Sequence, residues 1–282
     1  MNYRHAFHAG SFADVVKHAA LALVIERLKE KPSPFAVIDT HAGAGRYDLH
    51  SSEAERTGEW RRGIGRLMAL TTPPAELATY LEVVRALNRD EAGGLRWYPG
   101  SPWLAHALLR PGDRLFATEL HTADHETLAA LFQGVRGVKT VKLDGYQALA
   151  AFVPPRERRA LVLVDPPFEE VGEFERLADG VKTAHRRFAS GVYLLWYPIK
   201  ERVPIRRFHA TLKASGIRRV LCVEVMIGRE RDGERLAGTG LILVNPPFTV
   251  PESLARVLPP LAELLRADDD GFGARLEWLV PE

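Results

Sequence analysis

The chain has 282 residues, of which 46% are hydrophobic and 26% are charged, with a formal net charge of +2 and an isoelectric point of about 8.7. This length accommodates one large α/β domain with an insertion, and no apolar stretch approaches the roughly 20 residues of a membrane helix. A single cysteine excludes an internal disulfide, so we expect a cytoplasmic protein with no membrane partner, in which Cys222 is a buried thiol.

The first part of the chain is mostly helical in pattern. Ser11 and Asp14 have the spacing of a capping box, and apolar residues follow at helical intervals, which predicts a helix over 12–31. A strand is expected at 35–38. Residues 50–95 contain no convincing strand, so we expect a helical insertion there.

From residue 114 onward, predicted strands and helices alternate. Such alternation is typical of α/β proteins with a mainly parallel sheet and helices on both faces. The last two strands are joined by a short charged loop at 228–238, which requires that they are antiparallel. Seven strands with a terminal antiparallel strand indicate the Rossmann-like class I methyltransferase fold. After the first strand, the others are expected at 114–118, 138–143, 160–164, 191–196, 220–226 and 240–244.

Three predicted strands end in residues suited to a nucleoside. The turn at 39–45 contains Gly43, which can adopt positive φ and turn its N–H toward a carboxylate or a sugar. Glu119 ends the next strand, where an acid accepts the hydroxyl groups of a ribose. Asp144, beside Gly145, ends the following strand and can accept from an adenine amino group, although capping a helix would also explain it.

The segment 161–168 joins a buried strand to a rigid corner. Its four apolar residues suit a strand covered on both faces, and the two prolines cannot continue the ladder. Asp165 and the Pro166 carbonyl offer acceptors, and Phe168 offers a flat ring. Together they suit the exocyclic amine of a planar base that has left its stack. We therefore predict that Asp165, Pro166 and Phe168 are the catalytic residues.

A second copy of this pattern occurs at 241–248, where Asn245 takes the place of the acid. If the strand that precedes it runs antiparallel to its neighbours, its carboxyl end lies at the opposite edge of the sheet. We interpret this second motif as a strand terminator.

Several motifs together resemble a known family. The segment 39–47, Asp-Thr-His-Ala-Gly-Ala-Gly-Arg-Tyr, is much more specific than the Asp-Pro-Pro motif, which many amino methyltransferases share. The set is similar to that of the RlmJ family of 23S ribosomal RNA adenine-N6 methyltransferases, and the resemblance extends to residue 282. Its other segments are Tyr3-Arg4-His5, Phe7-His8-Ala9-Gly10, Asp14-Val15, Lys17-His18 and Tyr98-Pro99-Gly100-Ser101-Pro102.

The resemblance implies that S-adenosyl-L-methionine is the cofactor. It implies that Tyr3 faces the RNA, that His5 and Lys17 lie near the active site, and that Asp165 touches both cofactor and target. We assign Tyr3, His5 and Phe168 to the substrate RNA. The expected cofactor-binding residues are Lys17, His18, His41, Gly43, Ser101, Glu119, Asp144, Gly145 and Asp165.

We therefore expect a monomer with a single methyltransferase domain at 1–282 and a helical insertion subdomain at 50–95. Its partner would be 23S rRNA, protein-free or in an early assembly precursor. No metal is expected, because soft ligands are absent near the N-terminal histidines and their spacing matches no standard site.

Other functions use the same residues. A DNA adenine-N6 or a protein glutamine methyltransferase would have the same pocket. A non-catalytic RNA-binding module on a methyltransferase fold is an alternative of another class, although an intact Asp165 and a complete cofactor set speak against it. A nicotinamide oxidoreductase would leave the 165–168 corner without a role.

Overall fold

The computed structural model describes residues 4–89, 94–230 and 236–282, so Tyr3 of the predicted RNA site lies outside the described residues. The strands are β1 (Ala36–Asp39), β2 (Arg46–Asp48), β3 (Trp97–Pro99), β4 (Arg114–Glu119), β5 (Val138–Lys142), β6 (Ala160–Val164), β7 (Val192–Ile199), β8 (Val220–Ile227), β9 (Gly238–Val244) and β10 (Phe272–Val280). The helices are α1 (Phe12–Lys29), α2 (Ser52–Thr57), α3 (Glu59–Arg62), α4 (Ile64–Met68), α5 (Ala78–Leu87), α6 (Ser101–Leu108), α7 (Thr122–Leu131), α8 (Gly145–Phe152), α9 (Glu173–Arg187), α10 (Arg202–Lys213) and α11 (Val250–Leu265), with short 3-10 turns η1 (His5–Phe7) and η2 (Ala75–Leu77).

One sheet organises the molecule. Its strand order is β10-β8-β9-β7-β6-β1-β4-β5, and the five strands from β7 to β5 are parallel. β9 runs antiparallel to both β7 and β8. The chain moves outward in one direction from β1 to β4 and in the other from β1 to β6, which creates a switch point where open α/β sheets bind ligands.

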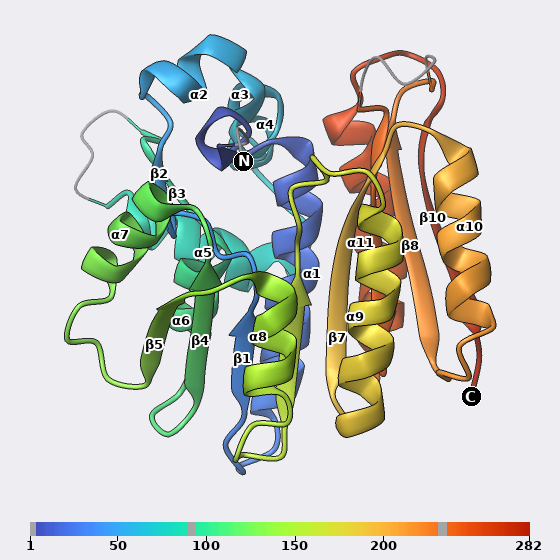
Figure 1. Ribbon diagram of the computed structural model, residues 1–282. Helices are drawn as coiled ribbons and strands as arrows, with labels where there is room; N and C mark the ends of the chain where they lie inside the picture. The colour runs from blue at the N-terminus through green and yellow to red at the C-terminus, as the bar shows by residue number, and fades with distance from the viewer. Residues whose placement is uncertain (1–3, 90–93, 231–235) are drawn as a thin grey trace.

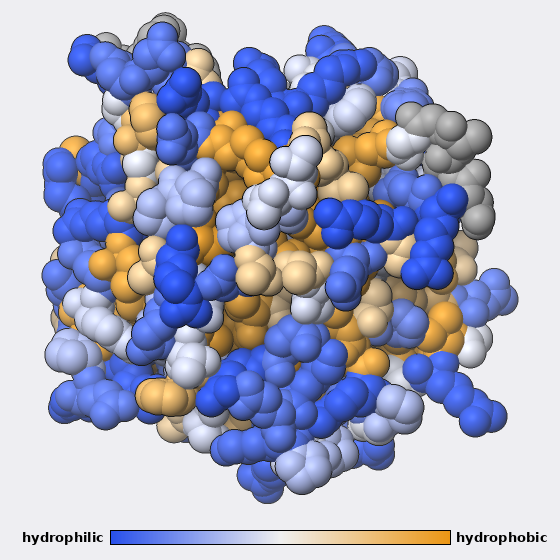
Figure 2. All heavy atoms as spheres, turned by 180° about the vertical axis from the view of Figure 1, so that it is seen from behind, coloured by the Kyte–Doolittle hydropathy of each residue, from blue (hydrophilic) through white to orange (hydrophobic). Residues whose placement is uncertain are grey.

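The sheet separates two apolar layers. Side chains from α1, α6 and α11 pack on one face, and side chains from α8, α9 and α10 pack on the other. In Figure 1, α8 and α9 lie in front of the sheet and α1 lies behind it. From behind, hydrophilic residues cover most of the periphery, and hydrophobic residues show mainly toward the middle (Figure 2). None of the described helices combines the length and the apolar character needed to cross a membrane.

The predicted fold class is confirmed, with an addition at one end. The Rossmann-like, mostly parallel sheet has the predicted antiparallel strand, but it contains eight strands instead of seven. The eighth, β10, pairs antiparallel with β8 and forms the edge. A separate two-stranded sheet joins β2 to β3. β10 escaped prediction because polar Arg275 and Glu277 interrupt its apolar pattern, as is common at a sheet edge.

The predicted capping box at the start of α1 is wrong in its details. Ser11 is the N-cap residue, but its side chain makes no capping hydrogen bond. The Asp14 carboxylate instead accepts from the Gly10 backbone N–H at 3.0 Å. Asp14 is buried, and its second oxygen is used by Lys17, so this acid serves the interior and not the helix end.

Between β1 and β4 the chain leaves the sheet. Helices α2, α3, α4 and α5 occupy this stretch, with η2 before α5, and no strand occurs among the described residues of 50–95. Figure 1 shows α2, α3 and α4 above the sheet, near the N-terminus of the chain. The backbone N–H of Ile64 donates to the Gly10 carbonyl at 2.8 Å, which ties α4 to the turn before α1.

A buried tyrosine fixes the register between β7 and β9. Tyr197 lies directly opposite Gly240, and its hydroxyl group donates to Glu224 at 3.0 Å. A Cβ atom added at Gly240 would lie 2.0 Å from the tyrosine ring. Because the ring is fully buried, it has no space into which to move. Glycine is therefore needed opposite this ring.

We expect Gly240→Ala to lower the free energy of unfolding by about 1–3 kcal/mol, as overpacking in a core does. Urea denaturation measures this loss. In a Tyr197→Val background, which removes the ring, the same substitution should have a much smaller effect. An equal loss in both backgrounds would contradict the steric explanation.

Candidate active site

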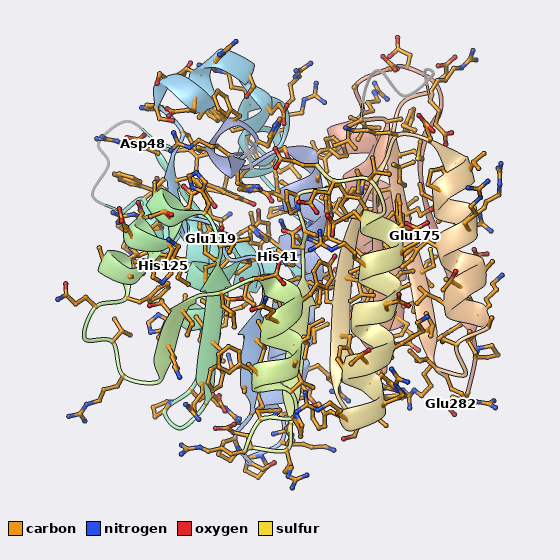
Figure 3. All side chains as sticks on the ribbon, in the orientation of Figure 1. His41, Asp48, Glu119, His125, Glu175 and Glu282 are labelled. Atoms are coloured by element: carbon orange, nitrogen blue, oxygen red, sulfur yellow. The ribbon has the colours of Figure 1, made fainter. Side chains whose placement is uncertain are left out.

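A cavity of about 590 Å³ lies beside the switch point of the sheet. His41 and Glu119 lie at the upper ends of β1 and β4 in Figure 3. All the site residues that the sequence predicted and the structure describes line this cavity. They are His5, Lys17, His18, His41, Gly43, Ser101, Glu119, Asp144, Gly145, Asp165, Pro166 and Phe168.

A buried lysine connects the first helix to the corner after β6. Lys17 on α1 forms ion pairs with Asp165 and, at 2.9 Å, with Asp14, and its side chain is 4% exposed. Burial lowers the pKa of Lys17, but the charges of Asp14 and Asp165 outweigh this effect and hold the pKa above its ordinary value. Asp14 also accepts a hydrogen bond from His5 at 2.8 Å. The lysine is therefore a permanent cation between two carboxylates.

The corner after β6 holds its aromatic ring in a fixed place. Phe168 has a φ of 51°, in the left-handed region that non-glycine residues seldom adopt. Its ring contacts Phe174 on α9 and Trp196 on β7, with centroid distances of 4.8 and 5.8 Å. The ring stays half-buried at the cavity wall. A planar ligand can therefore contact a ring that is already positioned.

The acids predicted to hold a nucleoside are already hydrogen-bonded to backbone groups. Glu119 accepts from the Gly43 N–H at 2.8 Å and from the His121 N–H at 2.7 Å. Gly43 has the expected positive φ of 59°. One oxygen of Asp144 caps α8, while the other faces Arg176 at 3.7 Å. These contacts hold both carboxylates rigid, with lone pairs left for a ligand.

His18 and, beside the cavity, Asp39 are buried, and His41 is partly buried. Burial lowers the pKa of His18 to about 3 and the pKa of His41 to about 4, so both rings are neutral at pH 7. Asp39, at the end of β1, has one oxygen without a hydrogen-bond partner among the described residues. Burial raises its pKa to about 7, although a hydrogen bond from Ser101 opposes this rise.

Gly145 makes room for one of these rings. A Cβ atom there would lie 2.4 Å from the His41 ring and 2.5 Å from the Thr40 carbonyl oxygen. The close approach of α8 to the turn after β1 therefore requires glycine at this position.

The second motif, Asn-Pro-Pro-Phe at 245–248, does not line this cavity. Asn245 follows β9, whose end lies beside the start of β7. Its side-chain amide donates to the carbonyl groups of Ala189 and Gly191 at 2.7 and 2.9 Å. The direction of β9 confirms that this motif ends a strand at the opposite edge.

Among the residues of the cavity wall that were not predicted, two lie against Lys17. Trp196 lies on β7, with the Lys17 ammonium 6.0 Å from its ring centroid. Asp14 was given no role in the site, yet it is the second carboxylate on Lys17. A signal existed for Trp196, because it falls at the carboxyl end of a predicted parallel strand.

Comparisons with known proteins agree along the whole chain. A family model described as ribosomal RNA large subunit methyltransferase D, RlmJ, matches residues 32–280. The chain is 44% identical over 282 residues to ribosomal RNA large subunit methyltransferase J of Escherichia coli K12, and 41% identical over 285 residues to the protein of the same name from Haemophilus influenzae, with 100% of each chain covered. A crystal structure of a Legionella pneumophila protein is 30% identical, has a TM-score of 0.86 and covers 96% of this chain and 98% of its own.

The raised pKa of Asp39 predicts how the stability of the fold depends on pH. The folded state keeps this proton up to about pH 7, whereas the unfolded chain releases it near its ordinary value of 3.8. Asp39 therefore destabilises the fold increasingly as pH rises from about 4 to 7, and the loss is constant above that range. Asp39→Asn should remove a penalty of a few kcal/mol at pH 8 and almost none at pH 4.

Urea denaturation of both proteins at several pH values measures this difference. Asp48→Asn is a matched control of opposite sign, because burial of Asp48 is outweighed by its hydrogen bond from Arg96, which lowers the pKa of Asp48. A stability gain for Asp39→Asn that does not depend on pH would show that Asp39 is ionised in the folded protein.

Proposed function

The chain belongs to the RlmJ family of ribosomal RNA large subunit methyltransferases, and we propose that it transfers a methyl group from S-adenosyl-L-methionine to the N6 amine of an adenine in 23S rRNA. The observation that carries this proposal is that the ends of four neighbouring strands line one cavity. The turn after β1, the acids after β4 and β5, and Asp165 after β6 all line it.

The cavity suits the proposed cofactor. Its volume of about 590 Å³ falls within the range of roughly 300–1,000 Å³ for small-molecule sites. Glu119 and Asp144 would hold hydroxyl and amino groups, which carboxylates accept, and Gly145 would let the ligand approach the backbone. When bound, S-adenosylmethionine supplies an electrophilic methyl group.

Asp165 and Pro166 would prepare the target amine. The N6 lone pair of adenine is delocalised into the ring, which makes the nitrogen a poor nucleophile. Accepting its two N–H groups at the Asp165 carboxylate and the Pro166 carbonyl would turn the nitrogen toward tetrahedral geometry. After methylation the nitrogen would be positively charged, and Asp165 would accept one of its protons. Positioning of reactants alone contributes up to about 7–11 kcal/mol in favourable systems.

Lys17 would keep Asp165 in place for this role. Its ammonium group lies between Asp165 and Asp14, and all three side chains are buried or nearly so. A carboxylate that is paired with an ammonium group can only accept hydrogen bonds, so the pair selects a ligand that donates them. An amine fits that requirement, and a carbonyl does not.

The proposed function also includes the form of the RNA substrate and the parts of the protein that contact it. We propose one methyltransferase domain at 1–282 that acts as a monomer, with 50–95 as an insertion subdomain that helps to select the substrate. The substrate would be protein-free 23S rRNA or an early assembly precursor, and the site of action the cytoplasm. Phe168 would stack on the extruded base, with His5 and Tyr3 on the RNA side.

Asp165→Asn should lower methyl transfer to protein-free 23S rRNA by roughly 100-fold or more, because asparagine cannot accept the proton. Labelled cofactor measures the rate, and mass mapping of the RNA identifies the modified base. Parallel reactions with naked DNA and with protein extract test the alternative substrates. Cofactor binding without transfer to any substrate would favour the non-catalytic RNA-binding module.

Asn245→Asp is the matched control, since it places the same acid before the same Pro-Pro-Phe at the far edge of the sheet. It should leave the rate of the folded protein unchanged, and urea denaturation checks the fold, because aspartate cannot donate to the carbonyl groups of Ala189 and Gly191. Full activity in Asp165→Asn would exclude the proposed role of this carboxylate.

Phe168→Ala should lower kcat/KM for RNA by roughly 5- to 150-fold, the equivalent of about 1–3 kcal/mol of base stacking. Phe168→Tyr keeps a flat ring and should remain active. The matched control is Phe248→Ala in the second motif, because Phe248 is 76% exposed. Equal rates for Phe168→Ala and the unsubstituted protein, with the fold intact by urea denaturation, would contradict stacking.

A further inference from the structure

Two neutral histidines of the cavity wall are each hydrogen-bonded to a buried hydroxyl group. Nδ1 of His18 lies 2.8 Å from the Tyr98 hydroxyl oxygen, and Nδ1 of His41 lies 2.8 Å from Oγ1 of Thr40. Within the described ranges, no hydrogen-bond partner is present for Nε2 of either ring. A neutral imidazole carries one N–H, and its position decides whether Nε2 donates or accepts.

The chain of hydroxyl groups beyond His18 fixes its proton. The Tyr80 and Tyr98 oxygens are 2.9 Å apart, and both side chains are fully buried. Tyr80 makes no other hydrogen bond to the part of the chain that the structure describes. If His18 donated from Nδ1, Tyr98 would donate to Tyr80, and the Tyr80 proton would be buried without an acceptor, which is unfavourable.

If the hydrogen bonds run in the opposite direction, both tyrosine hydroxyl protons have an acceptor. Tyr80 donates to Tyr98, and Tyr98 donates to Nδ1 of His18. The single N–H of His18 is then on Nε2, where it can donate into the cavity.

The hydroxyl group beside His41 accepts a hydrogen bond from the ring, whereas the one beside His18 donates to the ring. Oγ1 of Thr40 lies 2.9 Å from the Leu163 carbonyl oxygen, which can only accept, so Thr40 donates to it. The same hydroxyl group cannot also donate to His41. Nδ1 of His41 therefore carries the N–H and donates to Thr40, which leaves a lone pair on Nε2. This arrangement uses a strand carbonyl of β6 to set a ring that follows β1.

We propose that these two networks lock His18 as the Nε2–H tautomer and His41 as the Nδ1–H tautomer, so that the cavity presents one ring donor and one ring acceptor. Tyr98 and Thr40 are then positioning residues for ligand recognition. His18 would bind an acceptor oxygen, and His41 would bind an O–H or N–H group.

The identity of the acceptor oxygen rests on the proposed function. Glu119 and Asp144 can only accept hydrogen bonds, so they suit the hydroxyl and amino groups of the cofactor and not its carboxylate. That carboxylate needs donors, and the His18 N–H is one. The first turn of α6, which has no side-chain cap and begins at the cavity, adds backbone N–H groups. We assign the methionyl carboxylate to His18.

The tautomers can be measured without any ligand. Long-range ¹H–¹⁵N correlation spectra of protein labelled at histidine distinguish Nδ1–H from Nε2–H, and His18→Gln and His41→Gln assign the two rings. We expect Nε2–H for His18 and Nδ1–H for His41. Tyr80→Phe and Thr40→Ser should keep these tautomers, because Tyr98 still donates and the serine hydroxyl still accepts. Nδ1–H on His18, or Nε2–H on His41, in the unsubstituted protein would overturn the proposal.

Tyr98→Phe and Thr40→Val should release the two rings and weaken binding of S-adenosylhomocysteine by roughly tenfold each, about one hydrogen bond. Calorimetry measures the affinity, with Tyr80→Phe and Thr40→Ser as controls that stay within about twofold, since each keeps the relevant hydrogen bond. Altered tautomers with unaltered affinity would overturn the recognition role.

5′-Methylthioadenosine, which lacks the amino acid part, tests the carboxylate assignment. Tyr98→Phe should leave its affinity unchanged, whereas an equal loss for both ligands would overturn the assignment. If the unsubstituted protein bound neither ligand, the proposed function would fail, but the tautomer measurement would still stand.

Discussion

A buried lysine paired with two carboxylates is the constraint on which the site depends. Lys17 reaches from α1 to Asp165, which lies 148 residues later, and Asp14 supports it from one turn away. A buried charge without a partner destabilises a protein by several kcal/mol, so each of the three side chains requires the other two. The contact therefore positions the corner after β6 and also joins the first helix to the centre of the sheet.

The two acids at the ends of β4 and β5 are held by backbone atoms instead. Both oxygens of Glu119 accept from main-chain N–H groups, and Asp144 caps the helix that it precedes. Because these contacts do not depend on flexible side chains, the acceptors are rigid before a ligand arrives. Preorganised groups of this kind need little rearrangement on binding.

The sequence predicted most of the parallel sheet, since runs such as 161–164 are apolar throughout and end in turn residues. It also predicted the cavity, because the carboxyl ends of parallel strands share one edge. The direction of β9 separated two nearly identical motifs, of which only Asp165 faces the cavity. Two features escaped prediction for different reasons, one distant and one local. Tyr98 meets His18 across 80 residues, and Pro259 and Pro260 concealed α11 by interrupting its helical pattern.

The placement of β10 has a consequence for folding. Before it pairs, β8 presents a row of free amide and carbonyl groups on an apolar strand, which is a template for strands of other molecules. The segment that covers this edge follows β9 only after the whole of α11, so its pairing is non-local and late. Partly folded chains should therefore be most prone to self-association along this border of the sheet, which the mature protein conceals.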